Sequence, residues 1–313
     1  MIISAEKLRE KWRSAESCKD AYYRIGSFHN LEWHLGHRDV GERALMLLSP
    51  VEMTLLPSSK SISVTKGYRE DGYWTLSFVL SEKTQEEVFE TLCADLINFS
   101  QGGSSQKQVL SRLAKRYHQW NLLLAHQKSG LLSESERKGL FGELTYLSFI
   151  LKQGNSPQKS IQGWVGPDGA DQDFVYADGW YEIKSVGAAA ECVTISSLQQ
   201  LDSELPGKLV VMRIDKCAPE HQKGKSLLSL VHEILDIIQT SPDAIALFES
   251  KLMNYGFIAL PDYAEYKYHF SGVQSYNVDE AFPRLTAKNV PIQVSSVQYT
   301  VSLAGIEAWK EEV

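Results

Sequence analysis

The sequence lacks long hydrophobic runs, and this absence narrows the class of protein. No segment approaches the ~18 consecutive apolar residues that a membrane-spanning helix needs. Residues 1–7 carry charges early and contain no long apolar stretch, so they do not resemble a secretory signal peptide. We therefore expect no membrane partner and a cytoplasmic location.

Cysteine is scarce, with four residues in the chain. They lie far apart, and no two have Cys-x-x-Cys spacing. This spacing argues against a disulfide framework or a zinc knuckle, and it favours a reducing compartment. The four are Cys18, Cys93, Cys192 and Cys217.

Common catalytic signatures are also missing from the sequence. The chain has no Gly-x-x-x-x-Gly-Lys-Ser/Thr phosphate-binding loop, and none of its eight histidines accompanies a Ser or Cys nucleophile motif. His34 and His37 flank Leu35-Gly36 without a third ligand nearby, which predicts a loop pair rather than a metal site. The net charge of −7 argues against bulk coating of nucleic acid, although a local basic patch remains compatible with it.

The length of 313 residues allows two domains, or one core with a large extension. Strand-like runs at 62–65 and 73–80, followed by an amphipathic helix from Ser81, predict an α+β domain over residues 1–100. A Gly/Ser-rich linker is expected at 101–105. We expect residues 104–240 to form a second domain, made of a core and the helix that precedes it. Residues 241–313 are expected to form a C-terminal α+β extension.

A basic helix is predicted directly after this linker, with an apolar stripe from Val109 to Leu124. Arg112, Lys115 and Arg116 lie on it and are candidate contacts to a DNA backbone. A solvated polar face is an equally weighted alternative.

The segment Asp173–Lys184 contains the most informative pattern. Asp178-Gly179 is a strong hairpin-turn signal between two strand-like runs. With these two residues at the centre of the turn, Asp173 should lie opposite Lys184. Because strand side chains alternate between faces, Asp173, Glu182 and Lys184 should share one face. The other face is expected to hold Phe174, Tyr176, Tyr181 and Ile183.

Glu143 supplies a third carboxylate in a helix predicted from Ser133 to Lys152. It falls within the apolar stripe of that helix, where an acidic group is costly unless it is paired or metal-bound. The alternative is a glutamate at the border of the helix that points to water or pairs with a nearby arginine.

Clustered carboxylates repel one another unless a positive charge lies between them. Glu143, Asp173 and Glu182 are therefore predicted to hold Mg²⁺ or Mn²⁺, cations that prefer oxygen ligands. Lys184 would steady the charge that develops during phosphodiester hydrolysis. The alternative is an ordinary exposed face with a cross-strand Asp173–Lys184 pair worth ~0.2–1 kcal/mol.

Two other aspartates compete with Asp173. Asp171 would face the same way if the strand began earlier, and Asp168 forms a literal Pro-Asp pair within a glycine-rich loop. Asp173 is preferred because it opens the apolar strand directly. Gln200 could support the site from the start of the following helix, although a surface glutamine is the default interpretation.

Several short motifs are spread along the chain. They are Leu92–Leu96, Gly139–Leu144, Trp164–Pro167, Asp173-Phe174, Tyr181–Ser185, Ile195-Ser196, Gln200-Leu201, Ala281–Leu285 and Val297–Tyr299. Together these motifs resemble a prokaryotic PD-(D/E)XK family of unknown function, in the restriction-endonuclease-like superfamily. The resemblance implies an α/β (α+β) protein with an α-β-β-β-α-β core and α+β extensions at both ends. It also implies Asp173, Glu182 and Lys184 as the motif residues, with Glu143 as the helix carboxylate.

The resemblance implies a metal-dependent DNA endonuclease, with Mg²⁺ or Mn²⁺ as cofactor and DNA as partner. It further implies a part in restriction or antiviral defence, with other subunits as partners. The alternative function is a non-catalytic or partner-dependent subunit that keeps the nuclease fold and binds DNA or protein. An RNA-directed nuclease is the weaker third reading, and the oligomeric state, a homodimer included, is left open.

Overall fold

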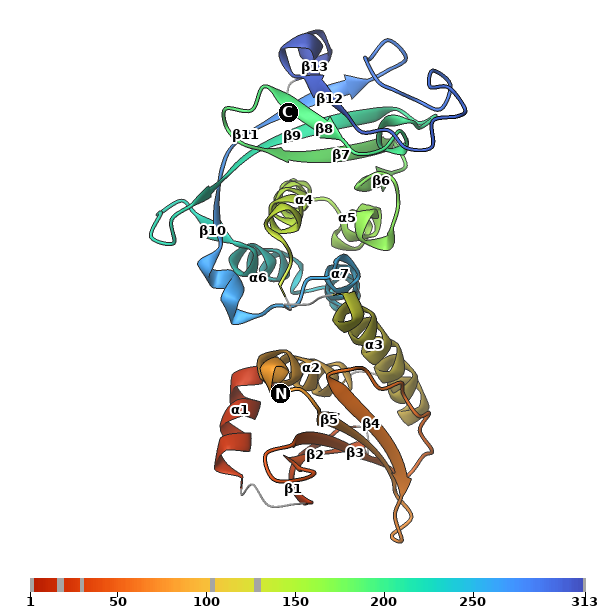
Figure 1. Ribbon diagram of the computed structural model, residues 1–313, viewed down its shortest axis with the longest axis vertical. Helices are drawn as coiled ribbons and strands as arrows, with labels where there is room; N and C mark the ends of the chain where they lie inside the picture. The colour runs from red at the N-terminus through yellow and green to blue at the C-terminus, as the bar shows by residue number, and fades with distance from the viewer. Residues whose placement is uncertain (1–2, 16–19, 29–30, 102–104, 127–130, 312–313) are drawn as a thin grey trace. The chain divides into compact units, whose positions relative to one another are not determined.

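The computed structural model describes residues 3–15, 20–28, 31–101, 105–126 and 131–311. The chain divides into two compact units, Met1–Gly130 and Leu131–Val313, which are taken separately below. Each unit combines helices with a sheet, which confirms the predicted α+β class (Figure 1). Among the described residues, no helix is both long and apolar enough to cross a membrane.

The units do not coincide with the three parts expected from the sequence. The basic helix was expected to belong with residues 104–240, but it falls within unit 1. Residues 241–313 were expected to form a separate extension, but they fall within unit 2. Residues 102–104 of the expected linker lie outside the described residues.

Unit 1 is built on a five-stranded antiparallel sheet of order β1-β2-β3-β5-β4. The strand-like runs at 62–65 and 73–80 are β4 and β5. His34 and His37 lie on strand β2 and not in the predicted loop. Every second side chain from Leu31 to His37 is buried, which is the pattern of a strand with one face on the core. The strands are β1 (Ala21–Phe28), β2 (Leu31–His37), β3 (Arg43–Ser49), β4 (Ile62–Tyr68) and β5 (Trp74–Leu80).

Helices cover this sheet and bury apolar side chains against it. Trp12 of the first helix and Phe89 of the second pack with ring centroids 5.8 Å apart, and both rings are buried. The helical elements are α1 (Ala5–Ser14), η1 (Lys83–Gln85), α2 (Glu86–Phe99) and α3 (Gln106–His126).

Helix α2 of unit 1 carries one buried carboxylate, Glu90, and one half-buried carboxylate, Asp95, and arginines neutralise both. Glu90 is 1% exposed, and its carboxylate accepts a hydrogen bond of 2.7 Å from Arg9 Nε. It accepts another from a guanidinium N–H of Arg43. Asp95 accepts two hydrogen bonds of 2.7 Å from Arg116. Each acid on α2 is thus matched by a cation from another element.

Unit 2 contains a twisted sheet of order β10-β11-β9-β7-β6, with β13 added beside β11. The β7–β9 pair is parallel and the other pairs are antiparallel. In Figure 1, two helices, α4 (Glu134–Lys152) and α5 (Pro157–Gly163), lie on one side of this sheet. Two short strands, β8 (Cys192–Ile195) and β12 (Tyr299–Ser302), lie on the other. The strands are β6 (Phe174–Tyr176), β7 (Gly179–Val186), β9 (Gly207–Cys217), β10 (Lys225–Ser226), β11 (Lys267–Val278) and β13 (Lys310–Glu311).

The helix α4 (Glu134–Lys152) begins at a capping box formed by Ser133 and Glu136. Its Gly142 lies so close to β7 that a Cβ there would be 2.0 Å from Ser185 Oγ. This close approach carries the next residue, Glu143, toward the strand. The other helical elements are α5 (Pro157–Gly163), η2 (Gly166–Asp168), η3 (Gln199–Leu201), α6 (Leu227–Ile238), α7 (Pro242–Tyr255), η4 (Pro261–Glu265) and η5 (Ala304–Trp309).

The strand that follows the hairpin, expected as the third strand of the core, does not join the main sheet. β8 (Cys192–Ile195) leaves the main sheet and pairs with β12 (Tyr299–Ser302) in a separate two-stranded sheet. Its alternation of exposed and buried residues suits a strand with one face on the core, which Val193 and Ile195 join. The helix expected to start near Gln200 is only the short 3₁₀ turn η3, Gln199–Leu201.

Candidate metal centre

The hairpin β6–β7 has a different register from the predicted one. Phe174 pairs with Tyr181 and Tyr176 pairs with Gly179, so the two turn residues are Ala177 and Asp178. Continuing this register places Asp173 beside Glu182 instead of Lys184. The displacement of the pairing is an even number of residues, so every side chain stays on its predicted face.

Asp173 is fixed at the entrance to β6 by three backbone amides. Its carbonyl oxygen accepts hydrogen bonds from the N–H groups of Val165 and Gly166 at 2.9 and 3.0 Å. Its carboxyl Oδ2 accepts the N–H of Ile183 on β7 at 2.7 Å. The side chain is therefore held against the strand that carries Glu182 and Lys184.

Glu182 lies in the middle of β7 and is 1% exposed. One carboxyl oxygen, Oε1, lies 2.8 Å from the Lys184 ammonium. The other, Oε2, is buried and receives no hydrogen bond of ordinary geometry from a described residue, although the backbone N–H of Asp173 interacts with this carboxyl group and lowers its pKa. An acidic oxygen of this kind is costly to bury, so its presence calls for a further positive partner.

Lys184 is held between Glu182 and a glutamine from the next segment. Its side chain is 15% exposed, and its Nζ donates to Gln200 Oε1 at 3.0 Å. The same oxygen accepts the backbone N–H of Ser196 at 2.8 Å, which fixes the amide. Gln200, a candidate supporting residue from the sequence, thus contacts the predicted lysine directly.

Glu143 reaches the same region from α4 and is 6% exposed. Its Oε2 accepts the indole N–H of Trp164 at 2.7 Å. Trp164 is itself fully buried and forms an isolated β-bridge with Phe174, the residue after Asp173. The helix carboxylate is thereby tied to the start of the hairpin.

The three carboxylates influence one another strongly. Burial, followed by the charge of Asp173, raises the pKa of Glu143 well above its ordinary value. Burial raises the pKa of Asp173 to about 6, against the opposing effects of the Ile183 N–H and Lys184. Burial and the charge of Asp173 raise the pKa of Glu182 to about 8. One lysine does not compensate three acids, so the cluster favours an added cation.

The two competing aspartates lie elsewhere. Asp168 Oδ2 accepts from the buried ammonium of Lys251 at 2.6 Å, and Asn254 donates to Oδ1 at 3.1 Å. Lys251 also donates to the carbonyl of Trp164, so the literal Pro-Asp pair anchors the η2 turn to α7. Asp171 is exposed on the loop before the hairpin.

The basic helix of unit 1 contains one residue that does not suit its suggested role. Arg116 is 4% exposed and already pairs with Asp95, so its guanidinium supports the core of unit 1 and does not face a phosphate. The guanidinium of Arg112 lies 4.8 Å from the centre of the Phe99 ring, and Lys115 is exposed. For these two residues a DNA contact stays a prediction.

Three supporting residues were missed as site residues by sequence reasoning. Trp164 and Lys251 hold the loop before Asp173, and Tyr255 of α7 interacts with Glu143 and Asp173, whose charges contribute to raising its pKa. Burial is the main cause of that rise. Trp164 stands in a recognised motif, but no local pattern marks Lys251 or Tyr255, which come from a distant helix.

The site contains the ligand types that Mg²⁺ and Mn²⁺ prefer, namely carboxylate oxygens. Within the described residues, however, no three His, Cys, Asp or Glu side chains are already grouped tightly enough to hold a metal ion. The buried and unpartnered Glu182 Oε2 nevertheless fits a cation that would draw the carboxylates together. Glu143, Asp173 and Glu182 are the residues that would hold it.

One of three comparisons with known proteins gave a match. Searches of curated proteins and of solved structures gave no significant match. A family model described as "Putative PD-(D/E)XK family member, (DUF4420)" matches residues 8–304, which is nearly the whole chain. The chain therefore belongs to this PD-(D/E)XK family, whose restriction-endonuclease-like superfamily is consistent with the mixed α/β fold.

Proposed function

We propose that this protein is a divalent-metal-dependent DNA endonuclease that hydrolyses phosphodiester bonds. The observation that carries the proposal is the convergence of two buried carboxylates, one half-buried carboxylate and one lysine on a single hairpin and its neighbouring helix. The carboxylates are Glu143, Asp173 and Glu182, and their charges interact with one another. Membership in a PD-(D/E)XK family supports the same class of activity.

In this proposal each residue has a distinct role. Asp173 at the start of the hairpin and Glu182 on β7 would hold Mg²⁺ or Mn²⁺, and Glu143 would contribute from α4. A divalent cation in this position stabilises negative charge on the phosphoryl group. The ammonium group of Lys184, which pairs with Glu182 in the free protein, turns to the negative charge that develops on the phosphate. The side chain of Gln200 holds this ammonium group in place.

A second candidate function has its own supporting observation. Lys184 already neutralises Glu182 at 2.8 Å, and the described side chains include no ready-made metal cage. This pairing of the lysine with the glutamate is what we would expect in a non-catalytic or partner-dependent subunit that keeps the nuclease fold. In that case a partner protein or DNA would have to separate Lys184 from Glu182 before metal binds.

The deciding experiment is a nicking and cleavage assay on supercoiled plasmid with Mg²⁺ or Mn²⁺. Wild type should cut, and Lys184→Ala and Lys184→Met should not, although the two variants keep the fold as judged by circular dichroism. Cutting by the variants at the wild-type rate would remove Lys184 from the mechanism. No cutting by any of the proteins would favour the partner-dependent subunit.

A parallel assay addresses the nucleic acid. The same proteins are incubated with a single-stranded DNA and with an RNA of the same sequence. Preference for DNA is expected, and RNA cleavage that depends on Lys184 would favour an RNA-directed nuclease instead. The part in restriction or antiviral defence, the other subunits and a homodimer stay predictions from the resemblance.

A further inference from the structure

One buried lysine of unit 2 has no part in the proposed hydrolysis. Lys251 lies on α7 and is 3% exposed. A buried ammonium is costly unless it is paired, so its partners indicate its role. These partners are the carbonyl oxygen of Trp164 and the carboxylate of Asp168, whose Oδ2 lies 2.6 Å from Lys251 Nζ. Both belong to the short loop that leads from α5 into the hairpin.

Trp164 connects this ammonium to Glu143. The indole of Trp164 is fully buried, and its N–H donates to Glu143 Oε2 at 2.7 Å. The carbonyl oxygen of the same residue accepts a hydrogen bond from Lys251. The indole ring also packs on α7, with its centroid 6.0 Å from that of Phe248. A shift of the Trp164 backbone would therefore move the indole donor away from the carboxylate of Glu143.

The same ammonium is connected to Asp173 through the η2 turn. Asp168 closes this turn, because its N–H donates to the carbonyl oxygen of Val165 at 2.9 Å. The N–H groups of Val165 and Gly166 donate to the carbonyl oxygen of Asp173 at 2.9 and 3.0 Å. Asn254 of α7 donates to Asp168 Oδ1 at 3.1 Å. The turn that holds the backbone of Asp173 is thus fastened to α7 at Asp168.

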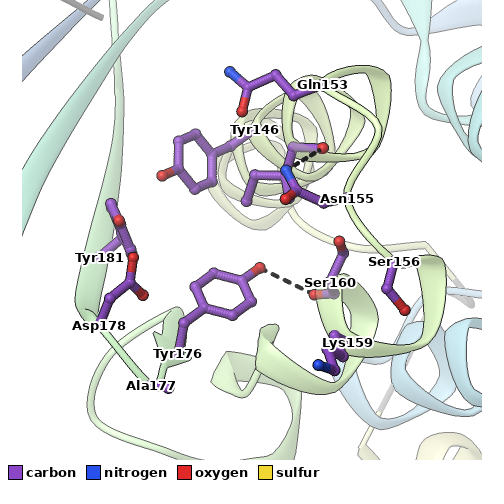
Figure 2. Close-up of a pocket in the computed structure, with 11 residues that line it drawn as sticks. Tyr146, Gln153, Asn155, Ser156, Lys159, Ser160, Tyr176, Ala177, Asp178 and Tyr181 are labelled. Atoms are coloured by element: carbon purple, nitrogen blue, oxygen red, sulfur yellow. Dashed lines mark hydrogen bonds between the residues drawn. The ribbon is translucent and has the colours of Figure 1, made fainter.

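The start of the loop is fixed by other contacts. Tyr176 of β6 donates its hydroxyl hydrogen to the carbonyl oxygen of Ser160 on α5 at 3.0 Å (Figure 2). Gly163, the last residue of α5, makes room for this ring, because a Cβ there would be 2.0 Å from Tyr176 Cε1. These contacts involve the face of the hairpin that lies away from the acidic cluster. Loss of the Lys251 ammonium should therefore affect residues 164–168 and leave α5 in place.

From these contacts we infer that Lys251 is a positioning residue of the metal centre, which fixes Glu143 relative to Asp173 and thereby sets the affinity for the divalent cation. It acts through Trp164 and Asp168 instead of binding the cation itself. Groups that lie behind metal ligands orient them, and loss of such a group typically weakens metal binding by about 10–100-fold. This inference rests on the proposed function and assigns a part in it to a helix outside the PD-(D/E)XK motif.

The affinity of the metal-free full chain for Mn²⁺, measured by titration calorimetry, tests the inference without any cleavage. Lys251→Met keeps an apolar side chain of similar length and removes the ammonium, and its affinity should fall by about 10–100-fold. Trp164→Phe removes the donor to Glu143 and should weaken binding in the same way. Because both residues act along one chain of contacts, the double variant should lose less affinity than the two single losses multiplied together.

The indole N–H signal of Trp164 reports on the position of the loop directly. In the NMR spectrum of the chain labelled with ¹⁵N-tryptophan, this signal is assigned by its absence from Trp164→Phe. In wild type the N–H donates to the carboxylate of Glu143. In Lys251→Met the signal should move toward that of an indole without a hydrogen bond. A purely structural role of Lys251 would leave the signal of the folded protein where it is in wild type.

Two matched control variants separate positioning from stability and from charge. Leu252→Ala removes a buried apolar side chain beside Lys251 on the same helix and should lower the stability of the protein in urea titrations. The affinity of this folded variant for Mn²⁺ and its Trp164 signal should stay at the wild-type values. Lys159→Met removes an exposed lysine of α5 (Figure 2) and should change neither quantity.

The outcomes distinguish this inference from the nuclease proposal. Wild-type affinity for Mn²⁺ in Lys251→Met would overturn the inference even if wild type cleaves plasmid. An equal loss of affinity in Leu252→Ala would also overturn it, because that pattern follows from stability alone. If wild type binds Mn²⁺ without cleaving plasmid, the expected loss in Lys251→Met would support the positioning role and count against the nuclease. No binding of Mn²⁺ by wild type would overturn the inference together with the metal centre.

Discussion

Both units bury carboxylates, but they surround them in opposite ways. In unit 1, Glu90 is 1% exposed and meets two guanidinium groups, from Arg9 and Arg43. In unit 2, Glu182 is equally buried and shares one lysine with an acidic neighbour, Asp173. The first arrangement is complete within the chain, whereas the second has surplus negative charge. A buried glutamate thus has its charge balanced by neighbouring arginines in unit 1, whereas in unit 2 it has an acidic neighbour and a single lysine.

The largest effect should follow from removing one member of the acidic cluster. Asp173→Asn keeps an oxygen for the Ile183 N–H and loses the negative charge. Metal-dependent cleavage of plasmid should fall on the order of 10²–10³-fold, as when one group that stabilises transition-state charge is lost.

The matched control for this change is Asp171→Asn, on the exposed loop two residues earlier. It should cleave at nearly the wild-type rate. The reverse result, with Asp171→Asn inactive and Asp173→Asn active, would make Asp171 the motif aspartate.

Neutralising the carboxylate of unit 1 should damage stability instead of activity. Glu90→Gln leaves Arg9 and Arg43 without their buried partner, which should cost about 3 kcal/mol of unfolding free energy. Hydrogen exchange of α2 peptides measures this unit separately. Glu87 is half-exposed, and Glu87→Gln loses only its ion pair with Arg9, so this change should cost ~0.5 kcal/mol or less. Equal effects of the two substitutions would show that burial does not matter here.

Metal affinity should depend on pH in a direction set by the raised pKa values. Asp173 and Glu182 have pKa values of about 6 and about 8, so they hold protons at lower pH, and a metal must displace those protons. Mn²⁺ affinity, measured by titration calorimetry, should rise by up to about 10-fold per pH unit between these values and then level off. An affinity that is constant over this range would place the metal elsewhere.

The smallest effect is a gain in stability. The pKa of Glu143 is raised in the folded protein, so the ionised form is penalised and stability from this group falls as pH rises above the unfolded value. Glu143→Gln should therefore raise the unfolding free energy in mildly alkaline, metal-free urea titrations by about 1 kcal/mol or more, the value of one pKa unit. At acidic pH, where the wild-type group is protonated in both states, the gain should vanish. A loss of stability at alkaline pH would mean that the chain already compensates this charge.

The sequence predicted the shared face of the hairpin although its register was wrong. A strand repeats every two residues, so an error of an even number of residues leaves Asp173, Glu182 and Lys184 together. Glu143 was predictable for a similar reason, because it interrupts an apolar stripe with helical spacing. These features depend on periodicity within one element, which the sequence displays directly.

Features that depend on pairing between distant segments were not predictable in the same way. The separation of β8 from the main sheet is decided by its partner β12, more than one hundred residues later. The support of the η2 turn by Lys251 likewise requires α7 to be placed first. Arg116 lay in a basic run that suggested DNA, and only the position of Asp95 on α2 reveals its buried partner.

The place of β11 in the sheet has a consequence for how the protein is made. This late strand pairs with β9 along nearly its whole length, and β9 in turn supports the strand of Glu182 and Lys184. The 94 residues from Lys184 to Val278 take roughly 5–20 s to synthesise at 5–20 residues per second. Throughout that interval the acidic hairpin exists on the ribosome without its completed sheet. Completion of the sheet behind the carboxylate cluster therefore has to wait until β11 has been translated.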